Sequence, residues 1–137
     1  SVNYFGRQLL RDFYFNQMPM DLKKKFSNEY NLEAELIKDN LYKKPNPNTY
    51  LAKFAKFLIA NKELEYSQSL IDKGFNLFIK NQISQFNNCS EVPLHFVGSI
   101  SFYLRNNLEI CLKKNGLKVG KILRKPIDGL VSYPQSN

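Results

Sequence analysis

The sequence has few of the residues on which metal and nucleophilic catalytic sites depend. Its 137 residues include two cysteines, one histidine and no tryptophan. Cys89 and Cys111 stand singly, without a CxxC spacing, which favours free thiols in a reducing compartment over a disulfide or a metal site. With His95 as the single histidine, we expect no histidine-based triad and no multi-histidine metal site, and a packed, hydrogen-bonded imidazole instead.

Long apolar segments and known catalytic motifs are missing as well. No stretch approaches the roughly 18 apolar residues of a membrane span, and no secretion signal is visible, so we expect a cytoplasmic protein without a membrane segment. The sequence contains no Walker A, GxGxxG, HExxH or GxSxG motif. Asp12 and Asp72 each neighbour a basic residue rather than a second carboxylate, which gives no paired acid and base.

The chain is rich in positive charge. It has 20 lysines and arginines against 12 acidic residues, a net charge of +8. Such an excess attracts nucleic acids or small anionic ligands. The basic residues are spread along the chain, however, and the aromatic residues fall on predicted core faces. Nucleic-acid binding is therefore the less favoured alternative, and a purely structural interaction domain is another.

The length of 137 residues suits one domain, 1–137, or part of a larger one, and the hydrophobic pattern is helical up to residue 87. Pro19 opens one short helix, and Asn31 is the predicted N-cap of another. After two prolines the pattern restarts, with Asn48 or Thr49 as the predicted cap. The predicted helical segments are 2–15, the segment opened by Pro19, 32–42, a stripe through 51–58, and about 64–87.

A change of pattern after residue 91 predicts a β-α-β unit over 92–124. Val92–Val97 is short, apolar and β-rich, residues 99–114 have helical spacing, and Leu117–Leu123 is a second strand. Gly116 sits at the position that ends the helix. Strands joined by such a crossover are parallel. A final helix or turn is expected at 126–134.

The junction Gly98-Ser99, between the first strand and the helix, is the candidate ligand site. Ligands of parallel sheets bind beyond the carboxyl ends of the strands, and a glycine there allows a close approach to the backbone. The first N–H groups of the following helix are also free. From the residues alone, a simple turn is the favoured interpretation and a ligand site is the alternative.

The whole chain resembles the BadF/BadG/BcrA/BcrD ATPase family. Four segments carry the resemblance by their order and spacing: FGRQLLRDFYFNQMP, YKKPNPNTYLAKFAKFL, VPLHFVGSISFYLRNNL and GLKVGKILRKPIDGL. It is strongest for members similar to N-acetylglucosamine kinase, in the actin/hexokinase/Hsp70 superfamily. The resemblance implies an α/β fold, namely a ribonuclease-H-like C-terminal lobe that is mostly helical with a parallel β-α-β unit. In relatives, two such lobes close on ATP and Mg²⁺.

The resemblance also implies roles for particular residues. Gly98, Ser99 and Ile100 match the turn that contacts the nucleotide, and Asp128 and Gly129 match a structural turn at the hinge. The catalytic aspartate and the phosphate-binding motifs of relatives precede the segment matched here. No catalytic residue and no metal ligand is therefore assigned, and the chain alone is expected to be inactive. It should pair with the missing part or with itself, since its strands would have open edges.

The function implied is ATP-dependent phosphorylation of N-acetylglucosamine or a related sugar by the full-length protein. The alternative within the family is an ATPase that drives a partner protein. Those activators resemble an iron–sulfur protein with bridging cysteines. Neither cysteine of this chain lies in such a motif, so the kinase branch is favoured.

Overall fold

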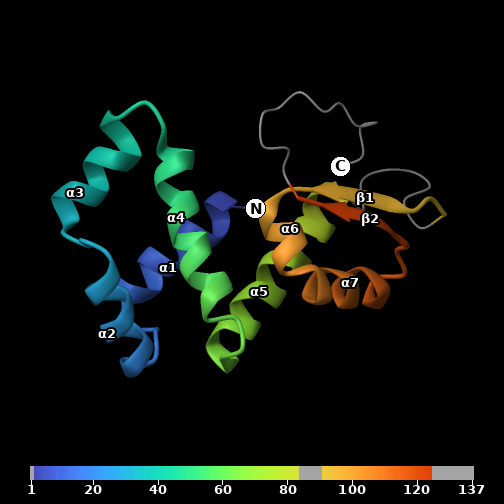
Figure 1. Ribbon diagram of the computed structural model, residues 1–137, viewed down its shortest axis with the longest axis horizontal. Helices are drawn as coiled ribbons and strands as arrows, with labels where there is room; N and C mark the ends of the chain where they lie inside the picture. The colour runs from blue at the N-terminus through green and yellow to red at the C-terminus, as the bar shows by residue number, and fades with distance from the viewer. Residues whose placement is uncertain (1, 84–90, 125–137) are drawn as a thin grey trace. The chain divides into compact units, whose positions relative to one another are not determined.

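The structure is a computed structural model that describes residues 2–83 and 91–124 (Figure 1). The chain divides into two compact units, Ser1–Leu70 and Ile71–Asn137, called here the N-terminal and C-terminal units. Cys89, Asp128 and Gly129 lie outside the described residues, as does the helix or turn expected at 126–134. None of the helices described combines the length and the apolar content needed to traverse a bilayer.

The N-terminal unit is helical, as the sequence pattern predicts. Its helices are α1 (Val2–Tyr14), α2 (Met20–Glu29), α3 (Ala34–Lys38), the π-helix η1 (Asp39–Lys43), α4 (Pro47–Ala60) and the start of α5 (Glu65–Phe78). The predicted helix at 2–15 and the short helix after Pro19 are confirmed to within a residue. Pro19 occupies the N-cap position of α2, where its fixed φ costs little.

The helix predicted over 32–42 starts later and changes its winding. Glu33 is the N-cap of α3, so the prediction that Asn31 caps this helix is wrong. The Asn31 side chain instead accepts a hydrogen bond of 3.1 Å from the backbone N–H of Glu33. This short loop is typical of asparagine, which closes turns through its own side chain. Beyond Lys38 the helix widens into η1, which ends at Lys43.

The cap predicted for the next helix is also displaced. Asn46 is the N-cap of α4 and Pro47 is its first residue, so Asn48 and Thr49 lie inside the helix. Proline suits the first helical position because the N–H that it lacks would have no partner there. The two prolines therefore mark the helix start more accurately than the polar residues that follow them.

Aromatic rings fill the core of the N-terminal unit. Phe26 of α2 is fully buried. Its ring centroid lies 5.6 Å from that of Phe54 and 4.8 Å from that of Phe57, both on α4. Helix α1 approaches α4 closely at Gly6, where a Cβ atom would lie 2.7 Å from the carbonyl oxygen of Leu51. The stripe predicted through 51–58 is therefore core, as expected.

The C-terminal unit contains the predicted β-α-β arrangement. Its elements are the end of α5, the π-helix η2 (Ile79–Ile83), β1 (Leu94–Val97), α6 (Ser99–Tyr103), α7 (Arg105–Lys114) and β2 (Val119–Leu123). The two strands lie side by side and are parallel, as predicted (Figure 1). The helix expected over 99–114 is instead two helices, because Leu104 (φ −110°) leaves helical geometry between them.

Gly116 ends α7 as the sequence predicts. Its φ of +72° lies in the left-handed region that glycine adopts without steric cost. The N–H of Gly116 donates to the carbonyl of Lys113, and the N–H of Leu117 donates to that of Leu112. This pair of bonds is the Schellman arrangement, which satisfies the last carbonyls of the helix and turns the chain into β2.

Candidate functional site

Gly98 joins β1 to α6 in a conformation that only glycine adopts readily. Its φ is +143° and its ψ is +159°. Its N–H donates to the carbonyl of Leu123 at 2.9 Å, and its carbonyl accepts from the N–H of Phe102 at 3.0 Å. Among residues 2–83 and 91–124, no atom outside the turn itself lies within 4 Å of the position that a Cβ atom would take. The turn is therefore fixed by its backbone bonds, and the described part of the chain leaves its outer side open.

The three residues predicted to contact a nucleotide differ in accessibility. Ser99, the first residue of α6, is exposed, and Gly98 is half-buried. The Ile100 side chain is only 6% exposed and belongs to the core. The structure thus presents the backbone of Gly98 and the hydroxyl of Ser99 at the end of β1, with Ile100 anchoring the turn from within.

Two arginines and two aromatic rings form a cluster that the sequence analysis missed. The Arg105 guanidinium carbon lies 4.8 Å from the Phe102 ring centroid. The Arg124 guanidinium carbon lies 5.9 Å from Phe102 and 5.8 Å from Tyr103. A signal was present: Arg105 follows Phe102 by three residues on helical segments, and Arg124 directly follows β2. The carboxyl ends of parallel strands meet at one edge of a sheet, so Arg124 returns to the edge where Gly98 lies.

This aromatic–arginine cluster, Phe102, Tyr103, Arg105 and Arg124, suits an anionic ligand. Arg105 also donates to the backbone carbonyl of Phe102 at 2.8 Å, which holds its side chain in place. In the described part of the chain, neither arginine forms an ion pair with a carboxylate. Guanidinium groups bind phosphates through two parallel hydrogen bonds, and they stack on planar rings. The cluster therefore supplies positive charge beside the glycine turn.

His95 has a structural role in the sheet. Its Nδ1 atom accepts a hydrogen bond of 2.6 Å from the backbone N–H of Lys121. The strand register shifts at this point, and the imidazole takes the place of a backbone acceptor for that N–H. Gly120 makes room for the ring, because a Cβ atom there would collide with it. The predicted packed, hydrogen-bonded histidine is confirmed.

Cys111 is buried in α7 and is a free thiol, as the sequence predicts. Burial raises the pKa of this thiol, and the negative charge of Asp72 raises it further. A raised pKa keeps the sulfur protonated and unreactive at neutral pH. Across residues 2–83 and 91–124, no group of three or more histidine, cysteine, aspartate or glutamate side chains is placed to hold a metal ion.

The chain is similar in sequence and structure to a protein described as a "Putative N-acetylglucosamine Kinase" from Porphyromonas gingivalis. The two share 34% sequence identity over 95% of this chain, with a TM-score of 0.84. This chain spans 46% of the length of that protein. No family model and no curated protein matches the sequence. The mostly helical α/β fold with a parallel two-stranded sheet is thus shared with part of a kinase-like protein.

Proposed function

We propose that this chain is the nucleotide-binding, C-terminal part of a sugar-kinase-like ATPase of the BadF/BadG/BcrA/BcrD type. The full-length protein would transfer the terminal phosphoryl group of ATP, with Mg²⁺, to N-acetylglucosamine or a related sugar. The observation that carries this proposal is the similarity to the Porphyromonas gingivalis protein, at 34% identity over 95% of the chain. The C-terminal unit would then belong to a ribonuclease-H-like lobe.

The glycine turn supports the assignment of nucleotide contacts. An open backbone at Gly98 would let an adenosine group lie against the end of β1, and the Ser99 hydroxyl would supply a hydrogen bond. Ile100 would hold the turn in position from the core. Asp128 and Gly129 would shape a hinge toward the other lobe. The aromatic–arginine cluster adds positive charge and planar surfaces for a nucleotide beside this turn.

Phosphoryl transfer requires more than this chain provides. The reaction depends on aligning the attacking hydroxyl with the phosphoryl group and on neutralising the developing negative charge. The catalytic aspartate and the phosphate-binding turns would come from the rest of the full-length protein. Bound Mg²⁺ would help to neutralise the negative charge of the phosphates there. We therefore expect this chain alone to bind nucleotide weakly and to transfer no phosphate.

Two glycines provide a matched test of the nucleotide site. Gly98 and Gly116 both have positive φ and both have open space around the position of a Cβ atom. Gly98→Ala and Gly116→Ala should therefore each strain the backbone, by about 1–3 kcal/mol. In a titration with ATP and Mg²⁺ followed by amide NMR, the signals of Gly98 and Ser99 should shift saturably.

The affinity for ATP should fall at least about 10-fold in Gly98→Ala, the equivalent of 1.4 kcal/mol, and stay unchanged in Gly116→Ala. Equal affinity in the two variants would remove Gly98 from the nucleotide site. Saturable binding of a DNA or RNA oligonucleotide, without binding of ATP, would replace the ATPase proposal with the basic-module alternative.

The full-length protein decides between the two ATPase branches. We expect ATP consumption that requires an added sugar, with N-acetylglucosamine and other amino sugars tested first. ATP hydrolysis that no sugar stimulates, but that a partner protein does, would assign the protein to the activator branch. The absence of any ATP turnover would contradict both branches.

The proposal also includes association through the C-terminal unit. Its strands are only partly covered, and Val97 at the end of β1 is 43% exposed. Sheet surface of this kind is usually covered by further strands or helices. We expect this chain to self-associate, or to bind the remainder of the proposed full-length protein when that is added as a separate chain. A monodisperse monomer by light scattering, unchanged by the added part, would contradict this.

A further inference from the structure

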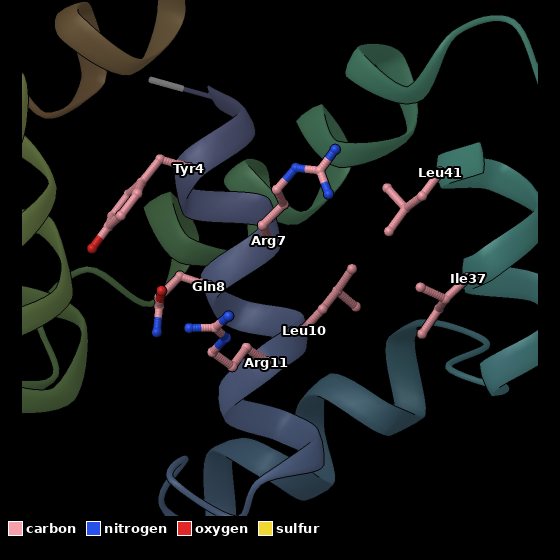
Figure 2. A pocket seen from close by; sticks show the side chains of 7 residues that line it. All are labelled: Tyr4, Arg7, Gln8, Leu10, Arg11, Ile37 and Leu41. Atoms are coloured by element: carbon pink, nitrogen blue, oxygen red, sulfur yellow. The ribbon is translucent and has the colours of Figure 1, made fainter.

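The N-terminal unit contains a pocket of its own, which the kinase proposal does not use. It lies along α1 and has a volume of about 370 Å³. Figure 2 shows the side chains that line it, from α1, α3 and η1: Tyr4, Arg7, Gln8, Leu10, Arg11, Ile37 and Leu41. All seven belong to one compact unit, so the pocket is formed within that unit.

Two arginines give the pocket its positive charge. Arg7 and Arg11 are four residues apart and therefore lie on one side of α1. Figure 2 shows Arg7 extending toward Leu41 and Arg11 toward Gln8. No carboxylate lines the pocket, and neither arginine has an ion-pair partner among the residues that the structure describes. Two like charges at this spacing slightly destabilise a helix unless an anion balances them.

The carboxylate that follows Arg11 in the sequence is engaged elsewhere. Asp12 is 9% exposed and accepts a hydrogen bond of 2.6 Å from the hydroxyl of Tyr66. It accepts another, of 3.1 Å, from the side-chain amide of Gln8. That bond leaves the amide oxygen of Gln8 and its second N–H for other partners. The charge of Asp12 is therefore committed to the core side of α1, and the two arginines stay available.

The other wall of the pocket is apolar. Leu10 and Ile37 are largely buried, at 6% and 9% exposure, and Leu41 is half-buried beside them. Figure 2 shows these three side chains on the side of α1 opposite Tyr4 and Gln8. A ligand that only carried charge would leave this surface exposed to water, whereas one with an apolar body would cover it.

We propose that this pocket binds a small organic anion. Its carboxylate or phosphate group pairs with Arg7, which extends toward Leu41, and Arg11 adds positive charge from the side of Gln8. Its apolar body packs against Leu10, Ile37 and Leu41. Guanidinium groups recognise both kinds of anion by paired hydrogen bonds. The proposal is independent of the kinase assignment, because every group that it uses lies in the N-terminal unit.

Phenyl phosphate is a suitable probe because it combines a phosphate with an apolar ring. We expect saturable binding to the full chain, with shifts of the Arg7 and Arg11 side-chain N–H signals in NMR titrations. Inorganic phosphate should bind at least about 10-fold more weakly, since it lacks the apolar body, and phenol should not bind saturably. Benzoate in place of phenyl phosphate separates a preference for carboxylate from one for phosphate. Absence of saturable binding by both aromatic anions would overturn the proposal.

Charge-matched variants separate the pocket from the general positive charge of the chain. Arg7→Gln/Arg11→Gln removes two charges from the pocket, and Lys24→Gln/Lys56→Gln removes two from exposed positions of the same unit. We expect at least about 10-fold weaker phenyl phosphate binding for the first pair and no change for the second. Equal losses of affinity in the two double variants would assign the binding to the overall positive charge of the chain and would contradict the proposed pocket.

The apolar wall is tested separately through Leu41, the most accessible of its three residues. Leu41→Asn should weaken phenyl phosphate binding several-fold, because the ring loses an apolar neighbour, and leave inorganic phosphate binding unchanged. Circular dichroism checks that each variant is folded. An equal effect on both anions would contradict the part of the proposal that concerns the apolar body.

Discussion

In the N-terminal unit Gly6 has no room for a side chain, whereas at Gly98 in the C-terminal unit no described residue beyond its chain neighbours comes within 4 Å of the position of a Cβ atom. At Gly6 the missing side chain lets α1 reach the backbone of α4. At Gly98 the residue is needed for its φ of +143°. The first glycine lets two helices pack in direct contact, with no space left at that point. The second holds a turn whose outer side no described residue covers.

The two units differ in the same way in their cores. In the N-terminal unit, Phe26 and its ring neighbours on α4 are buried on all sides. In the C-terminal unit, α6 and α7 each have buried residues, such as Ile100 and Leu108. Most residues of β1 and β2, in contrast, are only half-buried. A sheet of two described strands offers little area to either face. Substitutions should therefore lower the free energy of unfolding most in the core of the N-terminal unit.

Phe26→Ala should cause the largest loss of stability. Removing a fully buried phenylalanine costs about 3–5 kcal/mol, through lost apolar burial and the cavity that remains. The matched control is Phe15→Ala, since Phe15 is 68% exposed and its removal should change the free energy of unfolding by at most about 0.5 kcal/mol. Urea unfolding followed by circular dichroism measures both. Similar values for the two would show that the aromatic cluster is not the core.

Gly6→Ala should cause the next largest change in the free energy of unfolding, and the direction of that change is informative. Alanine normally stabilises a helix relative to glycine, by about 0.5–1 kcal/mol. Here the new Cβ atom would meet the Leu51 carbonyl oxygen at 2.7 Å, and backbone atoms yield only if α1 and α4 move apart. We expect a net destabilisation of about 1–3 kcal/mol in the same urea experiment. A stabilised variant would mean that the two helices do not approach so closely.

Gly120→Ala tests the tight-packing glycine of the C-terminal unit. The added Cβ atom would collide with the His95 ring and approach the Leu94 carbonyl oxygen at 2.9 Å. The ring can rotate away, but it then loses its bond to the Lys121 N–H. We expect Gly120→Ala to lower the free energy of unfolding by about 1–2 kcal/mol, measured by urea unfolding.

A double-mutant cycle identifies the cause of that loss. If the ring is responsible, Gly120→Ala should cost less in a His95→Ala background, because the collision is gone. The Leu94 carbonyl oxygen remains, so part of the cost should persist. Additive effects of the two substitutions would show that His95 and Gly120 do not interact.

Much of the helical fold could be predicted because apolar spacing determines which face of a helix is buried. The segment at 2–15 and the stripe through 51–58 both became core helices. Helix starts were harder to predict. Asn31, and Asn48 or Thr49, are the predicted caps, and the chain geometry instead places Asn46 at the N-cap of α4 and lets Asn31 close a loop. The break at Leu104 has no sequence signal such as proline or glycine, so nothing local indicated it.

At the candidate site, the sequence predicted the glycine turn but not its surroundings. A glycine between a predicted strand and a predicted helix can be read directly from the sequence, and glycine permits the positive φ found there. The guanidinium groups of Arg105 and Arg124 come from segments 19 residues apart and meet only through the parallel pairing of the strands. The pocket along α1 likewise requires α1 and η1 to lie together, which no local pattern reveals.

Tyr66→Phe should cause the smallest loss of stability, and the size of that loss should depend on pH. Tyr66 donates to the buried Asp12, and removing that hydroxyl should cost about 1 kcal/mol at neutral pH. Burial raises the pKa of Tyr66, and the hydrogen bond to Asp12 and its negative charge raise it further. A raised pKa in the folded state gives stability that is fully present below the unfolded value of about 10 and is lost as the pH rises beyond it.

The wild-type protein should therefore lose stability above about pH 10 more steeply than Tyr66→Phe, since only its unfolded state releases the Tyr66 proton there. Urea unfolding of both proteins from neutral to alkaline pH measures the difference. The other tyrosines contribute equally to the two proteins and cancel. Parallel pH profiles would mean that Tyr66 ionises alike in both states, and that the bond to Asp12 does not hold α5 to α1 within the N-terminal unit.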